Sequence, residues 1–282
     1  MRVLMIEISV LHHVTEAGSA RIGPRSEYAV PPEQLSAYLD CRRDWASRWP
    51  HEEEDGDEVL LTFDDGYRSV RTHVLPLLER FETRAIVFVT TSFVTGDVYP
   101  YELELAAVIE HHTRLQPDAD SPPVELSGQD SEESLYRRIR RPFKPASPRA
   151  RERRLDDLAA LNGYERSRFQ GESFLSWEEI AELDRHPLVT IGAHTHTHPV
   201  LTRRAPWTAY REMKKSKRKI EEVLGHEIYH FSYPYGRNNF IVRLLARLAG
   251  FQWAFTTEAK CPESIDDCDP MALPRPELQD LL

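Results

Sequence analysis

The chain has 282 residues, 40% of them hydrophobic, and its formal net charge of -10 comes from 46 acidic residues against 36 Lys and Arg. A chain of this length can bury a large core, and both one α/β barrel and two modest domains fit it. The acidic balance argues against a nucleic-acid-binding protein, because such proteins need a basic surface.

The amino terminus and the cysteines bear on where the protein works. The first residues are apolar, but Glu7 comes early, and neither a long h-region nor a small-residue cleavage site follows. No run reaches the roughly 18 apolar residues needed to cross a bilayer. Cys41, Cys261 and Cys268 are an odd number at wide spacing, which predicts free thiols rather than disulfides. We therefore expect a cytoplasmic protein without a transmembrane segment.

Along the chain, short apolar runs alternate with amphipathic segments, which is the pattern of parallel strands joined by crossover helices. The first part predicts strands at 2–11, 58–63 and 84–90, and helices at 32–49 and 68–80. The last part predicts helices at 176–185, 206–224 and 239–249, and strands at 188–193, 228–232, 252–257 and near 271–273. About seven strands in this order favour a distorted, incomplete TIM-like (β/α)7 barrel.

Between about 96 and 175 this alternation breaks. Residues 116–134 are polar and Pro-rich, and nine Lys or Arg follow between Arg137 and Arg154. We expect residues 1–282 to form a single domain in which this segment is an insertion, a lid or substrate wall over the barrel mouth. Two interpretations of its basic cluster stay open: a site for an anionic group such as a nucleotide or lipid phosphate, or a solvated helix face.

Two motifs directly follow predicted strands. TFDDG (62–66) places Asp64 and Asp65 after one strand, and HTHTH (194–198) follows another. The carboxyl ends of parallel strands meet at one edge of the fold, where α/β proteins place their chemistry. Imidazoles with one carboxylate, leaving coordination positions for water and substrate, are typical ligands of a catalytic zinc. These motifs predict a metal-dependent hydrolase.

A third motif, HFSYPYG (230–236), follows the start of a later strand, and its Pro/Gly turn directs Tyr235 towards the same edge. Together with TFDDG and HTxTH, in this order, it resembles the polysaccharide deacetylases of carbohydrate esterase family four, which share the NodB-homology domain. The segments FLSWEEIAEL, KKSKRKIEEVLG and GFQWAFTT also look like that family, so the similarity covers nearly the whole chain.

The resemblance implies a role for each motif residue. Asp64 would be the catalytic base, and the backbone N–H of Tyr235 would stabilise the oxyanion formed when water attacks the acyl carbon. The middle histidine, His196, would be an exposed or outer residue rather than a ligand. The metal, Zn2+ with Co2+, Ni2+, Fe2+ or Mn2+ as alternatives, would be held by Asp65, His194 and His198.

The chain departs from the family's best-known pattern in two places. Ser232 stands where the third motif usually begins with arginine, and LPR (273–275) stands where the fifth motif usually carries a histidine acid. A branch of the family with an xYPYG turn and a terminal LPR shows both changes. We expect Arg275 to replace the arginine that orients Asp64. Two candidates for the general acid stay open, His12 at the end of the first strand and His230.

The expected activity is removal of an N-acetyl or similar acyl group from an amino sugar or glycoconjugate, including nucleotide- or lipid-linked intermediates. Two alternatives stay open: a degenerate barrel that binds sugar or metal without turnover, and a deacylase or deformylase of a non-carbohydrate amide. Trp207 and Trp253 are candidates either for stacking on a sugar ring or for core positions. We expect no nucleic-acid partner.

Overall fold

The computed structural model of this protein describes residues 6–14, 29–45, 47, 58–98, 100–143, 146, 148–166, 173–258 and 268–278. The chain divides into two compact units: the first comprises Met1–Thr15, Val30–Asp97 and Phe174–Leu282, and the second comprises Glu16–Ala29 and Val98–Ser173. No described helix combines the length and the apolar character that crossing a membrane requires.

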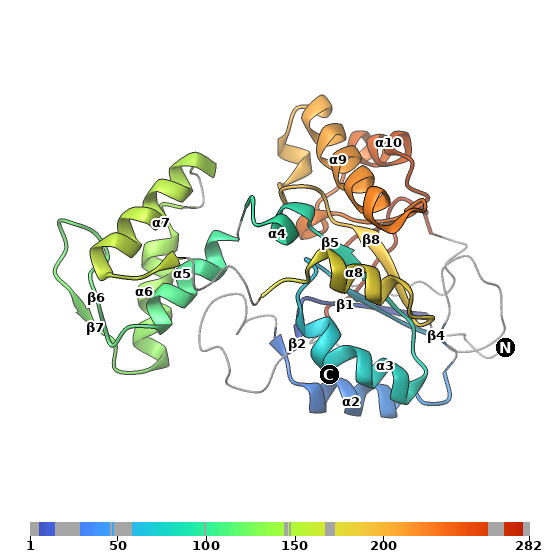
Figure 1. The fold of residues 1–282 in the computed structure, drawn as a ribbon, viewed down its shortest axis with the longest axis horizontal. Coiled ribbons are helices and arrows are strands. Elements are labelled where there is room, and N and C mark those ends of the chain that lie inside the picture. Colours follow the sequence, from blue (N-terminus) through green and yellow to red (C-terminus); the bar gives the residue numbers. More distant parts are fainter. Residues whose placement is uncertain are drawn as a thin grey trace. The chain divides into compact units, whose positions relative to one another are not determined.

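The first unit is built on a parallel sheet of six strands in the order β1-β4-β5-β8-β9-β10. The strands are β1 (Ile6–Leu11), β4 (Glu58–Phe63), β5 (Ala85–Val89), β8 (Val189–Ala193), β9 (His230–Ser232) and β10 (Trp253–Phe255). The connecting helices include α2 (Pro32–Asp40), α3 (Leu75–Phe81), α4 (Thr91–Thr95), α8 (Trp177–Asp184), α9 (Pro206–Leu224) and α10 (Phe240–Ala249). With helices covering the sheet (Figure 1), the predicted α/β fold of an incomplete TIM-like barrel is confirmed.

Shorter elements complete the first unit: β2 (His13–Val14), the π-helical turn η1 (Val70–Val74), and the single 3-10 turns η3 (Leu201–Arg203) and η4 (Pro234–Gly236). A further short strand, β3 (Ala29–Val30), contains the point in the sequence where the first segment of the second unit ends.

The strands divide the core in two. Successive side chains of a strand point to opposite faces. The inner face of the curled sheet carries a small cluster of Leu60, Ile86, Phe88, Phe255 and Leu273. The outer face contributes residues such as Leu61, Phe63, Val87 and Ile191 to the larger core beneath the helices. The alternation that points Leu60 inwards therefore does the same for Thr62 and Asp64, so the first aspartate of TFDDG reaches into the barrel.

Gly192 in β8 is needed for this inner packing. A Cβ atom built at this position would lie 2.5 Å from the Phe88 ring and 3.1 Å from the carbonyl oxygen of His230. Phe88 can therefore lie against the β8 backbone only because residue 192 has no side chain.

Three helices near the motif loops have clear boundary signals in the sequence. At α8, Ser176 accepts the N–H of Glu179 while the Glu179 carboxylate accepts the N–H of Ser176, a complete capping box. At α10, the Asn239 side chain accepts the N–H of Val242. Helix α9 begins at Pro206 and ends before the left-handed Gly225.

The second unit is helical and has its own core. It contains α5 (Tyr101–Glu110), α6 (Gln129–Arg140), α7 (Pro148–Asn162) and an antiparallel pair, β6 (Arg114–Leu115) and β7 (Val124–Glu125). Leu105, Ile109, Leu135, Phe143 and Leu155 are buried together inside it. The alternation breaks near 96–175 because this segment builds a separate core. Its role as a lid stays a prediction.

Several basic residues of the second unit are paired with acidic neighbours. Arg137 contacts Glu133 at 2.6 Å on α6, and Arg140 contacts Glu102 at 3.7 Å. Such partners favour the interpretation of the cluster as a solvated, ion-paired helix face.

Three predicted elements differ from the structure. The strand near 271–273 is reduced to one parallel bridge between Phe255 and Leu273, so six strands rather than seven form the described sheet. The helix predicted at 32–49 ends at Asp40, where the next N–H groups turn back onto Leu39 and Asp40. The helix at 68–80 begins as the wide turn η1, because Pro76 has no N–H to donate to the preceding turn.

Candidate metal centre

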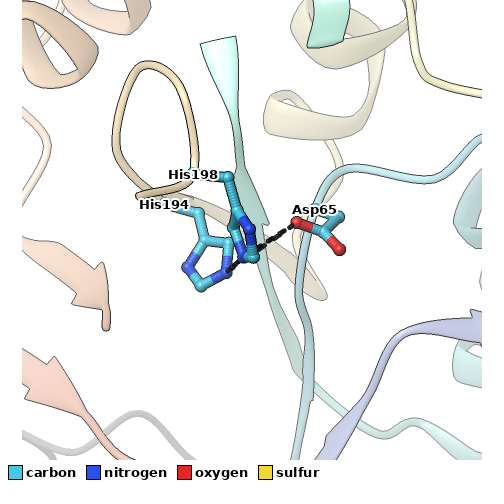
Figure 2. Close-up of side chains that lie close together, drawn as sticks. All are labelled: Asp65, His194 and His198. Atoms are coloured by element: carbon cyan, nitrogen blue, oxygen red, sulfur yellow. Dashed lines mark hydrogen bonds and ion pairs between the residues drawn. The ribbon is translucent and has the colours of Figure 1, made fainter. Parts of the chain in front are cut away.

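Three side chains converge at the carboxyl ends of β4 and β8. One ligand atom from each of Asp65, His194 and His198 lies within 4.8 Å of the other two (Figure 2). The two Nε2 atoms face each other at 3.1 Å, and Asp65 Oδ1 lies 3.8 Å from that of His194 and 3.6 Å from that of His198. The structure thus brings together the residues that the resemblance assigned to the metal.

A bend after β4 lets both adjacent carboxylates face one centre, where Asp64 Oδ2 lies 4.0 Å and Asp65 Oδ1 lies 3.8 Å from His194 Nε2. Asp65 has φ 70° and Gly66 has φ 76°, both in the left-handed region. Without this bend, neighbouring residues of a strand would point to opposite faces. The carbonyl of Gly66 then accepts the N–H of Leu175 at 2.9 Å, which holds the bend in place. Thr90, at the end of β5, donates its hydroxyl to Asp65 Oδ1 at 3.4 Å.

The loop after β8 is strained and anchored. Thr195 and His198 have φ values of 67° and 51°, which cost energy for residues with a Cβ atom. Thr195 Oγ1 accepts the His198 N–H at 3.0 Å. Thr197 donates both its N–H and its hydroxyl to the carboxylate of Glu212 on α9, at 2.8 and 2.9 Å. These contacts hold the His198 ring opposite that of His194.

Hydrogen bonding assigns the tautomer of His194. Its Nδ1 lies 2.8 Å from the carbonyl oxygen of Ser232, which can only accept, so Nδ1 carries the proton. Burial lowers the pKa of His194 to about 4, although Asp64 opposes the shift, so the ring is neutral at pH 7. Its Nε2 therefore presents a lone pair to the centre. Burial likewise lowers the pKa of His198 to about 4.

The donor set fits a divalent transition metal. Neutral imidazoles and one carboxylate are ligands of intermediate softness that suit zinc and its neighbours, and three protein ligands leave coordination positions open. Burial raises the pKa of Asp65. The nearby His194 and His12 lower it, but by less than burial raises it. A buried carboxylate in this state is stabilised by a bound cation.

Asp64 has a different partner, Arg275. The guanidinium is fully buried and donates to both carboxylate oxygens, Nη1 to Oδ1 at 3.0 Å and Nη2 to Oδ2 at 2.9 Å. Burial is the largest single effect and would raise the pKa of Asp64, but the charge and hydrogen bonds of Arg275, together with the charges of His194 and His12, outweigh it and hold that pKa well below its usual range. The predicted orientation of Asp64 by Arg275 therefore has the expected geometry.

The remaining donors of Arg275 are also paired. Its Nε donates to the carbonyl of Thr256 at 2.9 Å, and the two Nη atoms donate to the hydroxyls of Thr62 and Ser232, each at 2.8 Å. Ser232 in turn donates to Asp64 Oδ2 at 3.1 Å. Ser232, which stands where the resemblance leads one to expect an arginine, thus contacts both Arg275 and Asp64.

His12 lies beside these carboxylates. The carbonyl of the preceding residue, Leu11, accepts the N–H of Asp64 at 2.9 Å. His12 is near enough to Asp64 and Asp65 for its charge to lower the pKa of both carboxyls. The other candidate acid, His230, starts β9 two residues before Ser232, which is about 6–7 Å of strand away from the site edge. This placement favours His12.

Tyr235 occupies the PYG turn with φ 60°. Its ring lies 4.7 Å from that of His198, and the side chain is exposed. Of the five described non-glycine residues with positive φ, the four other than Glu82 lie in this centre or its turns: Asp65, Thr195, His198 and Tyr235. Strain of this kind gathers at functional sites, where surrounding contacts enforce it.

The structure corrects the expectation for His196 in part. This residue is outside the ligand cluster, as expected, but it is buried rather than exposed. Its Nδ1 lies 2.8 Å from Thr91 Oγ1, and its carbonyl accepts the N–H of Ser92. His196 therefore ties the histidine loop to α4.

Sequence reasoning missed two supporting residues. Thr62, inside TFDDG, is a further partner of Arg275, and its position two residues before Asp64 in a strand, on the same face, is the sequence signal that points to it. Glu212 gave no signal, because a glutamate in a basic amphipathic helix looks like any exposed charge.

Comparisons with known proteins agree with these motifs. The polysaccharide deacetylase family model matches residues 51–254. No curated protein sequence matches the chain. The deacetylase PplD of Streptococcus pyogenes, solved with acetate, has a similar structure, with 16% identity, a TM-score of 0.62 and coverage of 97% of this chain and 92% of that one.

Two further solved structures share the fold. The BpsB deacetylase domain from Bordetella bronchiseptica is 18% identical, with a TM-score of 0.59 over 98% of this chain and 96% of that one. IcaB from Ammonifex degensii is 19% identical, with a TM-score of 0.59 over 97% and 91%. The family match covers well over half of the sequence and includes TFDDG, HTHTH and the YPYG turn. The chain belongs to the polysaccharide deacetylase family.

Proposed function

We propose that this protein is a metal-dependent N-deacetylase that removes an acetyl or similar acyl group from an amino sugar of a glycoconjugate. The observation that carries the proposal is the contrast between two adjacent carboxylates. The carboxylate of Asp64 forms an ion pair with the buried Arg275, whereas the carboxylate of Asp65 points at two neutral imidazoles. One carboxylate is thus kept for proton transfer, and the other is left for a cation.

Asp65, His194 and His198 are the residues that would hold the metal. When bound there, a zinc ion supplies polarisation of the acyl carbonyl and a lowered pKa for water. Asp64 stays ionised at neutral pH and accepts the proton of the attacking water as general base. An oxygen held by Arg275 can still take this proton, because each carboxylate oxygen has two lone pairs.

Two further roles complete the proposal. The N–H of Tyr235 stabilises the oxyanion, because the strained PYG turn holds this residue against His198. His12 protonates the leaving amine, since it follows β1 beside Asp64. The bidentate contact between Arg275 and Asp64 supports an active hydrolase over a degenerate barrel, because it supplies the orienting arginine that the third motif lacks.

Acetate release tests this function. The purified protein is incubated with N-acetylated monosaccharides, oligosaccharides, and nucleotide- and lipid-linked sugars, with an N-formyl amide as a separate arm. We expect release from at least one carbohydrate, loss of activity on chelation and recovery with zinc. Release from no carbohydrate by metal-loaded protein would refute the proposal, and release only from the formyl amide would favour the deformylase alternative.

A further inference from the structure

Helix α10 presents bulky apolar side chains to solvent. Phe240 is 80% exposed, Leu248 is 63% exposed, and Ile241 and Leu244 are each about half exposed. We call these four residues the apolar face of α10. Scattered apolar residues are normal on a protein surface, but a row of them along one helix indicates an interaction surface.

The exposure does not come from a frayed helix. The opposite side of α10 packs Val242, Ala246 and Ala249 into the large core. Its flank is fixed by two ion pairs, because Arg243 and Arg247 contact the two carboxylate oxygens of Asp269 at 3.2 and 3.1 Å. The helix is thus held firmly, with its apolar face pointing outwards.

Basic residues lie alongside on α9, which packs against α10 (Figure 1). Helical spacing places Trp207, Arg211, Lys214 and Arg218 on one stripe of α9. Lys214 donates to the carbonyl of Ala249, the last residue of α10, at 3.1 Å, so this basic stripe borders α10. Trp207 is 66% exposed at the start of the stripe. Of the two alternatives for this tryptophan, its exposure excludes the core position.

The local charge is opposite to that of the whole chain. Residues 201–250 contain eleven Lys and Arg against four Asp and Glu, whereas the chain as a whole has a formal net charge of -10. The apolar face contains no charged residue, and the basic stripe ends next to Glu222, which Arg218 contacts at 3.7 Å. This combination of bulky apolar, aromatic and cationic side chains is complementary to the surface of an anionic bilayer, where apolar groups enter the boundary of the acyl chains and cations pair with headgroups.

We propose that α9 and α10 form a docking surface for an anionic lipid bilayer. The apolar face of α10 enters the boundary between headgroups and acyl chains, and the basic stripe of α9 pairs with anionic headgroups. Tyr235, whose ring touches that of His198, precedes Phe240 by only five residues. Docking therefore holds the candidate metal centre close to the lipid surface. A lipid-linked substrate would suit this position, a consequence that rests on the proposed function.

Vesicle flotation tests the surface. The full-length protein is mixed with vesicles of phosphatidylcholine alone or with added phosphatidylglycerol. We expect binding to the anionic vesicles only, weakened by salt and by about fivefold for each basic residue neutralised in Arg211→Gln and Arg218→Gln. Leu244→Glu and Leu248→Glu should abolish binding. The matched control is Val223→Glu, which adds the same charge at an exposed apolar position on α9 outside the stripe.

Two further measurements make the outcome decisive. Brominated lipids should quench the fluorescence of the wild type, and Trp207→Phe should lose most of that quenching. Melting temperatures of all variants exclude unfolding as the cause. Equal binding to neutral vesicles, no binding at all, or the same loss in Val223→Glu would overturn the proposal, as would a dimer in lipid-free solution that Leu244→Glu dissociates. Asp64→Asn should bind like the wild type, so docking and hydrolysis fail independently.

Discussion

At the scale of single residues, the site depends on what surrounds two neighbouring carboxylates. Asp64 and Asp65 are both buried at the end of β4, yet Arg275 lowers the pKa of one while burial raises that of the other. The neighbours of two identical side chains thus give them different pKa values. Mutating each aspartate should therefore have a different effect.

Replacing each aspartate by asparagine should divide the two roles. Asp64→Asn should keep the metal and lose about two or more orders of magnitude in kcat, because the acceptor of the proton is gone. Asp65→Asn should lose metal affinity, because a ligand charge is removed. Elemental analysis and acetate release measure the two effects on the same preparations. Equal metal loss in both variants would contradict the assignment.

Arg275→Ala should raise the pKa of Asp64, because burial then acts without the opposing charge. The acidic limb of the kcat/KM profile should therefore move to higher pH. Stability should fall by about 3–5 kcal/mol at neutral pH, since a buried carboxylate is left unpaired. A carboxyl with a lowered folded pKa stabilises above its unfolded pKa and stops doing so in acid, so this difference should shrink as the pH falls towards the folded value.

Arg275→Lys is the matched control for this prediction. It keeps the positive charge but loses the two parallel hydrogen bonds. We expect the pH limb to stay closer to that of the wild type while turnover drops. A purely structural arginine would change the melting temperature in both variants without moving the limb.

At the scale of elements, the close contact between β5 and β8 depends on a missing side chain. Gly192→Ala should destabilise the first unit by about 1–3 kcal/mol, because the new methyl group would overlap the Phe88 ring. Urea unfolding measures the loss. Phe88→Leu should restore part of it in the double variant, giving a coupling energy between the two positions. Additive losses would show that the β8 backbone, not Phe88, absorbs the change.

Sequence patterns located most strands and the motif helices to within one or two residues, because their apolar periods and caps are local signals. Strand β4 and helix α9 have the predicted bounds. What failed depended on distant partners. Among the described residues, the segment 271–273 forms a single bridge, between Leu273 and Phe255. The histidine loop takes its shape from Glu212 and Thr91. These long-range contacts leave no signal in the local pattern of apolar and polar residues.

At the scale of the whole molecule, the candidate metal centre joins segments far apart in the sequence. Asp65 follows β4, and the two histidines follow β8. A cation bound only by the folded state adds about 2.7 kcal/mol when present at a hundred times its Kd. Chelation should then lower the melting temperature of the full chain by about 5–10 °C.

Adding zinc should restore the melting temperature of the wild type and leave that of Asp65→Asn nearly unchanged. Differential scanning calorimetry with and without chelator makes the comparison. A wild-type melting temperature that changes with neither chelator nor zinc would contradict the proposed site.

The position of Arg275 also affects how the protein is made. Its partner Asp64 lies 211 residues earlier in the chain. At ordinary rates of translation, on the order of 10–40 s pass between the synthesis of the two residues. During this time the carboxylate of the nascent chain has no counter-ion from this arginine and keeps its contact with water. A chain terminated before residue 275 therefore cannot assemble the proposed base with its arginine partner.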